Sequence, residues 1–251
     1  MIEIENIKFA YQQEQPIINK LSLSIHRGET IGLVGANGAG KSTLLKLLVG
    51  LNLPVHGTIQ IAGIPVNKKT LDQVRKMIGF AFQDADSQLF MTTVYEDVAF
   101  GPRNLAYSEL EVDALVTSAL EQVDALQLAT RPPYKLSGGE KRRVAIATIL
   151  SMKPEIIILD EPAIGLDPKS RRGLISLLDR LEQTKIIATH DMDMALELCD
   201  RVVVMHEGQI EMIGQPVEIF RNRKLLERCN LEQPLAMQGC SVCNGRDDKC
   251  R

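Results

Sequence analysis

The sequence predicts an α/β fold, in which a mostly parallel sheet carries an antiparallel β subdomain and an inserted helical subdomain. A glycine-rich loop follows the apolar run Thr30–Val34 and precedes leucines with helical spacing. A second run, Ile156–Leu159, is apolar throughout, which is typical of a central parallel strand covered on both faces. Between the two runs, residues 84–150 are helical in character. The leucines after the loop are Leu44, Leu45, Leu47, Leu48 and Leu51.

The glycine-rich loop has the pattern of a phosphate-binding loop. Its residues are Gly35, Ala36, Asn37, Gly38, Ala39, Gly40, Lys41, Ser42 and Thr43. Glycines let backbone N–H groups line an anion-sized hollow, and Lys41 adds a positive charge for the terminal phosphates. Ser42 offers a hydroxyl to Mg²⁺, and the helix beginning there directs its positive dipole end at the phosphates. A chance match is the alternative, but the order of strand, loop and helix favours a site for a nucleoside triphosphate with Mg²⁺.

Strands are predicted on both sides of this loop. Residues 2–11 indicate a first strand with one irregularity, and Leu21–Ile25 alternates with polar residues like a half-exposed antiparallel strand. Tyr11 is a candidate to offer its ring face to adenine, with ordinary strand packing as the alternative. Further along, Gly57–Ile61 resembles a short edge strand and Ile78–Phe82 another strand.

The segment 84–150 reads as an inserted helical subdomain. Ser108–Glu111 matches a capping box, and Val112–Val123 follows the spacing of one helix face. Ser137–Glu140 forms a second capping box before an apolar helix. Glycines at a helix N-terminus also leave bare N–H groups, so the same residues could bind phosphate, and both interpretations can hold together. The candidate phosphate-binding residues are Ser137, Gly138 and Gly139.

Polar residues follow three predicted strands, at the edge where open α/β sheets bind ligands. Asp160 and Glu161 end the run from Ile156, and we predict Asp160 as a Mg²⁺ ligand and Glu161 as general base. A helix cap is the alternative for these acids. Gln83 ends its strand and is a candidate catalytic residue and Mg²⁺ ligand, although a surface Gln is common. His190 ends a later strand, where a γ-phosphate contact competes with simple backbone bonding.

The remaining core elements continue the α/β pattern. Asp167–Pro168 is a good start for a helix, Lys185–Thr189 reads as a buried strand, and Arg201–Met205 and Gln209–Ile213 complete the core. The predicted divisions are a nucleotide-binding α/β core with the β subdomain in 1–83, the helical subdomain in 84–150, the continued core in 151–222 and a cysteine-containing tail in 223–251.

Composition limits the functions that fit. With 45% hydrophobic and 24% charged residues and a net charge of −3, the 251-residue chain is ordinary for a globular protein and does not suggest a nucleic-acid surface. We interpret the short cluster Lys141-Arg142-Arg143 as a solvated helix face. No secretory signal or membrane span is apparent, so we expect a protein that stays in the cytosol and reaches the membrane only through a partner.

Taken together, these motifs resemble those of the ATP-binding subunit of ATP-binding cassette (ABC) proteins, over residues 2–220. The matching motifs are the phosphate loop, Gln83, Leu136–Glu140, Asp160-Glu161, Gly165-Leu166-Asp167 and His190. The resemblance implies an ABC ATPase, a P-loop NTPase that forms a head-to-tail dimer around two ATP molecules. Each ATP would lie between one copy's phosphate loop and its mate's Ser137–Gly139, with Asp167 near the seam. A homodimer is possible, and a heterodimer is the alternative.

A finer resemblance concerns residues 82–90 and 93–102, which are similar to the ATPases of energy-coupling-factor importers for cobalt, nickel or vitamins. It implies integral membrane partners that contact the segment after Gln83, at the cytoplasmic face of the membrane. Ala163-Ile164 departs from the family pattern without touching a catalytic residue. Cobalt or nickel import is the first hypothesis, and vitamin import the near alternative. A soluble ABC ATPase acting on nucleic acid is the alternative from another class.

The end of the chain departs from the family. Cys240, Cys243 and Cys250, with Cys229 as a further candidate, could bind a soft metal such as Zn²⁺. The spacing is not that of a standard zinc finger, so incidental thiols are the alternative. Structural disulfides are not expected in a reducing cytosol.

Overall fold

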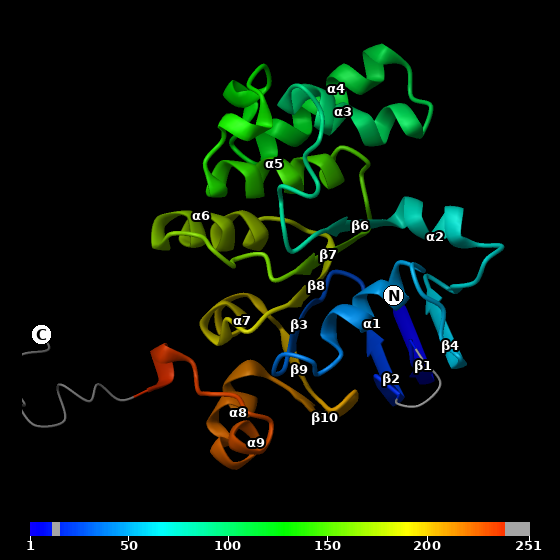
Figure 1. The fold of residues 1–251 in the computed structure, drawn as a ribbon, viewed down its shortest axis with the longest axis vertical. Helices are drawn as coiled ribbons and strands as arrows, with labels where there is room; N and C mark the ends of the chain where they lie inside the picture. Colours follow the sequence, from blue (N-terminus) through cyan, green and yellow to red (C-terminus); the bar gives the residue numbers. More distant parts are fainter. Residues whose placement is uncertain (12–15, 239–251) are drawn as a thin grey trace, which may run out of the picture.

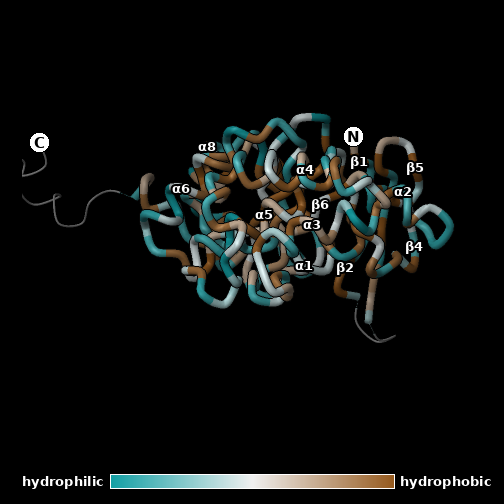
Figure 2. The backbone as a smooth tube through the Cα atoms, turned by 90° about the horizontal axis from the view of Figure 1, so that it is seen from above, coloured by the Kyte–Doolittle hydropathy of each residue, from teal (hydrophilic) through white to brown (hydrophobic). Residues whose placement is uncertain are grey.

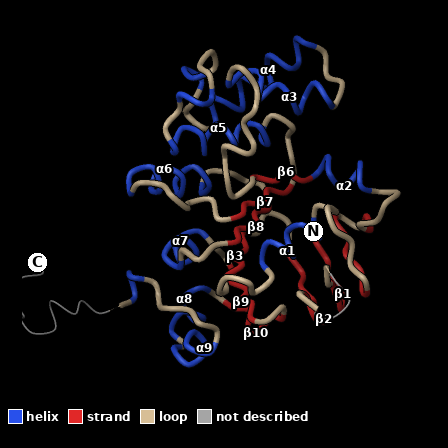
Figure 3. Tube along the Cα trace, in the orientation of Figure 1, coloured by secondary structure: helices blue, strands red, loops and turns tan. Residues whose placement is uncertain are grey.

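The computed structural model describes residues 1–11 and 16–238 and confirms the α/β fold around one main sheet. That sheet runs in the order β10-β9-β3-β8-β7-β6 and crosses the centre of the molecule (Figure 1 and Figure 3). Its strands are β3 (Thr30–Val34), β6 (Ile78–Ala81), β7 (Ile156–Asp160), β8 (Thr184–Ala188), β9 (Arg201–His206) and β10 (Gln209–Gly214). All neighbouring pairs are parallel except β9 with β10. The central strands β3, β7 and β8 are buried at every residue, as their apolar runs predict.

A second, antiparallel sheet forms the predicted β subdomain, in the order β2-β1-β4-β5. Its strands are β1 (Ile2–Phe9), β2 (Ile18–Ile25), β4 (His56–Ile61) and β5 (Ile64–Pro65). The predicted irregularity in the first strand is a register shift between Ile4 and Ile7. Helix α1 (Lys41–Leu48) lies between the two sheets (Figure 1), and its leucines share one apolar cluster with residues of both. This packing fixes the start of α1, and so the phosphate loop, against the sheet.

The helical subdomain extends from the β6 edge of the main sheet, at the top of Figure 1. It contains α3 (Val94–Asn104), α4 (Glu109–Gln122) and α5 (Gly138–Leu150), with short 3₁₀ turns at Leu126–Leu128 and Pro133–Lys135. Both predicted capping boxes, at Ser108 and at Ser137, are formed. One apolar cluster joins these helices to β7 and to α6 (Pro168–Asp179), so the subdomain is packed onto the core.

The C-terminal part of the described chain folds back on the main sheet near β9 and β10. Helix α7 (Met192–Leu198) precedes β9, and helices α8 (Pro216–Arg221) and α9 (Arg223–Arg228), with a 3₁₀ turn at Leu235–Met237, follow β10. Cys229 is buried in their apolar cluster, where burial raises the pKa of its thiol. Since a metal ligand must be a thiolate, this environment favours a packing role for Cys229. Cys240, Cys243 and Cys250 lie outside the described residues.

Several predicted boundaries differ from those observed. Leu51 does not extend α1, which ends at Leu48, because Gly50 follows in a left-handed conformation (φ 64°). The strand β4 is not the edge of its sheet, because the two-residue β5 pairs with its outer side. The predicted tail from residue 223 also begins with folded structure, since α9 is packed in the C-terminal cluster. Apolar segments gather toward the interior of the backbone trace in Figure 2.

None of the helices in the described ranges combines the length and apolar character that crossing a bilayer requires.

Candidate nucleotide site

The phosphate loop joins the end of β3 to the start of α1, in the predicted order. Gly40, directly before the helix, has φ 101°, a conformation that favours glycine. A Cβ on Gly35 would lie 2.4 Å from the carbonyl oxygen of Met205 on β9, so the loop needs glycine there for a close approach. The loop is thus shaped by its glycines and held against the neighbouring strand.

Lys41, the lysine of the loop, points back into the loop itself. Its Nζ donates to the carbonyl oxygens of Gly35 at 2.6 Å and Ala36 at 3.3 Å. Burial lowers the pKa of Lys41, while the nearby carboxylates of Glu161 and Asp160 act in the opposite direction. A buried ammonium beside two acids is suited to bind a polyanion, whose phosphate oxygens would replace the carbonyls as acceptors.

The two acids lie at the carboxyl end of β7, next to β8 in the parallel sheet. Asp160 is 7% exposed, and its Oδ1 is buried with no hydrogen-bond partner among the residues that the structure describes. A buried carboxylate oxygen with an open valence fits a hard cation such as Mg²⁺. Ser42 and Gln83 line the cavity described below, as does Glu161, the residue after Asp160, while Asp160 itself is not among the described lining residues. The donor set is therefore composed of oxygen atoms, the ligands that Mg²⁺ prefers.

Glu161 and His190 are in direct contact. Glu161 Oε2 lies 2.7 Å from His190 Nδ1 and also accepts the His190 backbone N–H at 3.2 Å. Glu161 is 8% exposed and has φ 49°, a left-handed conformation that is uncommon for a residue with a side chain. Its N–H donates to the carbonyl oxygen of Ala188 on β8 at 2.8 Å. The strained backbone thus directs a buried carboxylate toward His190 at the strand ends.

A cavity of about 1150 Å³ brings most of the predicted site residues together. Its lining includes the whole loop from Gly35 to Thr43, with Gln83, Glu161 and His190. The chain's C-terminal segment 230–235 also lines it, and this was not predicted. Asp193 holds that segment in place, accepting the N–H groups of Leu235 at 3.0 Å and Ala236 at 2.9 Å. A volume of this size is ample for a nucleotide.

The Ser-Gly-Gly tip (Ser137–Gly139) does not line this cavity in the described part of the chain. Gly138 instead borders a smaller hollow of about 330 Å³ that also includes Gln83 and Ile164. At the tip, Glu140 Oε2 accepts from the Ser137 N–H and hydroxyl, both at 2.8 Å, and these bonds lower the pKa of Glu140. The capping interpretation is therefore confirmed, and the phosphate-binding interpretation stays a prediction.

Tyr11 follows β1 and lies beside the antiparallel sheet. Its ring packs edge-on against Phe9, with centroids 4.9 Å apart, and its hydroxyl accepts from Asn52 Nδ2 at 3.2 Å. Tyr11 is still 54% exposed, so packing against the strand leaves much of the residue accessible to a ligand. Contact with adenine stays a prediction.

The interpretation of Lys141-Arg142-Arg143 as a solvated face is wrong for Arg142, which is 4% exposed. Its guanidinium donates to the carbonyl oxygens of Phe82 at 2.8 Å and Gln83 at 2.6 Å. Burial lowers the pKa of Arg142, with Asp84 acting against this effect. Arg142 thus ties α5, the helix of the Ser-Gly-Gly tip, to the backbone of Gln83. The position of Arg142, three residues after the Ser-Gly-Gly tip, was the only feature of the sequence that could have indicated this role.

Sequence reasoning also missed the Arg171–Asp191 pair beside His190. Arg171 is on α6 and Asp191 precedes α7, and they form a bidentate ion pair. Burial opposes ionisation of Asp191, but hydrogen bonds from Arg171 and from the Met194 N–H outweigh it and lower the pKa of Asp191. No local pattern marks a pair separated by 20 positions.

Comparison with known proteins agrees with this geometry. The family described as ABC transporter matches residues 18–164, which contain the phosphate loop, the Ser-Gly-Gly tip and both acids. The chain belongs to the ABC transporter family. As a member it is an ABC ATPase, and both the predicted family and the predicted fold class are confirmed.

Its relatives narrow the resemblance. A Geobacter sulfurreducens protein whose name assigns it to ABC transporter ATP-binding proteins is 50% identical over 97% of this chain and 98% of its own length. The energy-coupling factor transporter ATP-binding protein EcfA2 of Methanospirillum hungatei is 46% identical over 95% of this chain, which spans 61% of that protein. The corresponding EcfA of Methanothermobacter thermautotrophicus is 42% identical over 93% of this chain and 77% of its own.

Solved structures give the same result. The cbiO1 protein of Clostridium perfringens, described as part of the ABC transporter complex cbiONQ, superposes with a TM-score of 0.82 and 37% identity, over 91% of this chain and 94% of that one. A dimeric ATP-binding cassette in a post-hydrolysis state with ADP and phosphate superposes with a TM-score of 0.77 and 28% identity, over 86% of this chain and 99% of that one.

Proposed function

We propose that this ABC ATPase is the motor of an energy-coupling-factor importer, in which ATP hydrolysis drives uptake through integral membrane subunits. One observation carries the ATPase half of this proposal: Lys41, Glu161 and His190 line one cavity from three separate elements, and Asp160 lies near enough to act on the charge of Lys41. The relatives named as energy-coupling factor ATPases support the importer half.

In the proposed reaction each side chain has one task. Lys41 and the loop N–H groups bind the β- and γ-phosphates. Asp160, Ser42 and Gln83 would hold Mg²⁺, whose role is to neutralise charge on those phosphates. Glu161 accepts a proton from the attacking water, and His190, 2.7 Å from Glu161, orients that carboxylate and contacts the γ-phosphate.

Two copies of the chain are proposed to enclose two ATP molecules. The Ser-Gly-Gly tip supports this, because Ser137 and Gly138 are exposed at a helix N-terminus and do not line their own chain's nucleotide cavity. A solved relative is dimeric with ADP and phosphate. The Glu161→Gln variant with ATP and Mg²⁺ tests the arrangement by size-exclusion chromatography. A shift to twice the mass supports it, and a strictly monomeric protein overturns it.

An aromatic cleft offers a surface for the membrane subunits. It has a volume of about 610 Å³, between the β6 edge of the core and the helical subdomain, and Phe82, Phe90 and Phe100 on it are each more than 40% exposed. Asp97 lies in its wall and accepts the Phe90 N–H at 2.9 Å, while its Oδ2 has no partner among the described residues. Exposed aromatic side chains around a cleft of this size suit an apolar helix of a membrane subunit.

The cargo is proposed to be a cobalt or nickel ion, with a vitamin as the alternative. The cysteines near the end of the chain motivate the metal, since thiols bind soft cations, and they lie outside the described residues. Within residues 1–11 and 16–238 no cluster of three or more His, Cys, Asp or Glu side chains is arranged to hold a metal ion. The protein would act at the cytoplasmic face of the membrane, beside its partners.

Affinity capture from membranes tests the importer against the alternative of a soluble ATPase acting on nucleic acid. Recovery of an integral membrane protein, lost in Phe90→Asp and kept in the control Leu110→Asp, an exposed position of the helical subdomain outside the cleft, supports the importer. Nuclease-sensitive recovery with nucleic acid overturns it. Uptake of radioactive Co²⁺ or Ni²⁺ by the captured complex in vesicles then tests the cargo, and vitamin uptake without metal uptake would refute our choice.

A further inference from the structure

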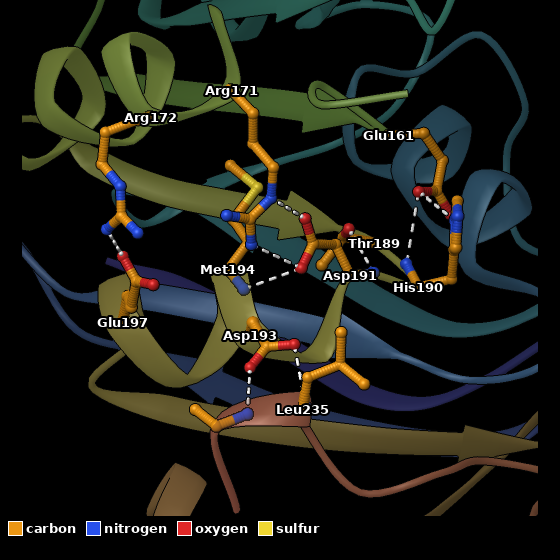
Figure 4. A network of polar contacts seen from close by, with 11 residues as sticks. Glu161, Arg171, Arg172, Thr189, His190, Asp191, Asp193, Met194, Glu197 and Leu235 are labelled. Carbon is orange, nitrogen blue, oxygen red and sulfur yellow. Dashed lines mark hydrogen bonds and ion pairs between the residues drawn. The ribbon is translucent and has the colours of Figure 1, made fainter. Parts of the chain in front are cut away.

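His190 is positioned mainly by its backbone. Its ring contacts Glu161 through Nδ1, yet 59% of the side chain is exposed. The direction of the imidazole therefore depends on the short loop that joins β8 to α7. Figure 4 shows that this loop is anchored twice, by Glu161 on one side of His190 and by Asp191 on the other.

The second anchor is a bidentate ion pair. Arg171 Nε lies 2.5 Å from Asp191 Oδ2, and the terminal nitrogen of Arg171 lies 2.8 Å from Oδ1. Both side chains are less than one-quarter exposed. The same Oδ1 accepts the Met194 N–H at 2.9 Å, and the Asp191 N–H donates to Thr189 Oγ1 at 2.9 Å. A planar guanidinium in two parallel bonds fixes orientation as well as distance.

Arg171 belongs to the first turn of α6, which also contacts the Ser-Gly-Gly tip. Asp167 caps this turn by accepting the N–H of Ser170 at 3.1 Å, and the Ser170 hydroxyl donates to Asp167 at 2.5 Å. A Cβ on Gly139 would lie only 2.5 Å from Ser170 Oγ, so the tip and α6 are in close contact. One helical turn thus touches the tip through Ser170 and the His190 loop through Arg171.

We propose that Arg171 is a positioning residue for ATP hydrolysis, which fixes the His190 loop to the first turn of α6 through its ion pair with Asp191. This proposal rests on the proposed function, in which the Ser-Gly-Gly tip serves the ATP of a partner copy and His190 serves the chain's own ATP. The first turn of α6 then joins the two sites mechanically. Arg171 is not among the described residues that line the nucleotide cavity, so it acts through His190.

An ordinary ion pair between packed helices is the competing explanation, and the protein contains a matched example. Arg172, the next residue, pairs with Glu197 at 2.8 Å between the same two helices. Arg172 is 65% exposed and its partner is at the far end of α7 from His190. Arg172→Met therefore removes a bond between α6 and α7 without disturbing the His190 loop.

Steady-state kinetics separate the two explanations. Arg171→Met should lower kcat for ATP about 10- to 100-fold while the KM for ATP changes less than about twofold, because only the reacting geometry is lost. Arg171→Lys should recover part of the loss, since it keeps the charge without the planar fork. Asp191→Asn keeps the cap on α7 and should match Arg171→Met, and combining the two should cost no more than either alone. Equal losses in Arg172→Met would overturn the proposal.

A spectroscopic measurement tests the proposal without relying on activity. The chain has four histidines, so the imidazole ¹⁵N resonances of His190 can be assigned by comparison with His190→Ala. Arg171→Met and Arg171→Lys should shift only the His190 resonances, and Arg172→Met should shift none. Unmoved His190 resonances in both Arg171 variants would refute the positioning role. Absence of ATPase activity in the unaltered protein would instead refute the proposed function and leave this measurement standing.

Discussion

Replacing Glu161 with Gln is the most direct test of the proposed chemistry. The substitution keeps the size and shape of a side chain that is 8% exposed, and it removes only the charge and the proton-accepting oxygen. The 2.7 Å contact with His190 Nδ1 survives, because an amide offers both a donor and an acceptor. Asp160, whose Oδ1 has no partner within residues 1–11 and 16–238, and Lys41 are left in place for Mg²⁺ and phosphate.

The expected loss follows from the role of a general base. Such a group contributes about 10²- to 10⁴-fold to a rate, which corresponds to about 2.7–5.5 kcal/mol in the activation barrier. Binding should not weaken, because Lys41 loses a nearby carboxylate that competes with the phosphates for its charge. We therefore expect kcat to fall by that factor while the affinity for ATP is unchanged or higher.

Phosphate release measures kcat, and a fluorescent ATP analogue measures affinity. Glu155→Gln is the matched control, since Glu155 precedes the same strand and pairs at the surface with Arg27. It should retain full turnover. Turnover within about threefold of the unaltered protein in Glu161→Gln would contradict the assignment of Glu161 as base.

Three further outcomes follow from the described contacts. Lys41→Ala removes a charged donor and should weaken ATP binding about 10- to 100-fold by titration calorimetry, and equal affinity would contradict the phosphate-loop assignment. Arg142→Met leaves the carbonyls of Phe82 and Gln83 without their donor, so the free energy of unfolding in urea should fall by about 1–3 kcal/mol, and an unchanged midpoint would refute that role. Because the pKa of folded Asp191 is lowered, its contribution is complete above about pH 4 and is lost as pH falls through the folded-state pKa. Its Asn variant should therefore lose less stability than the parent protein on acidification below about pH 4, and parallel losses would count against the pair.

The main sheet and the loop could be predicted because their signals are local. Thr30–Val34 was located to the residue and the strand from Ile156 to within one residue at its end, since each is a mostly apolar run that ends at a glycine or an acid. The contact between Glu161 and His190 follows from parallel neighbours whose carboxyl ends meet at one edge.

Contacts between distant segments could not be predicted from the sequence in the same way. Arg142 was assigned to solvent because its acceptors are carbonyls about 60 positions earlier, and backbone groups leave no mark in a sequence. The segment 230–235 is held at the nucleotide cavity partly by Asp193, which accepts the N–H groups of Leu235 and of the next residue, Ala236, about 40 positions later in the chain. The proposed ligand of the Ser-Gly-Gly tip belongs to a second chain, and a contact between copies has no pattern within one sequence.

The capping box at the Ser-Gly-Gly tip also fixes the direction of the Glu140 carboxylate. A carboxylate at position 140 stands one residue from glycines that are proposed to meet another molecule's triphosphate, where like charges would repel. Because Glu140 accepts hydrogen bonds from the Ser137 amide and hydroxyl, its charge is directed at its own helix and away from the proposed phosphate ligand. If the Ser137 hydroxyl turned to bind an incoming anion, the Glu140 carboxylate would lose that hydrogen bond and point toward the anion. The tip would therefore repel an anion whose charge is not balanced by a bound cation.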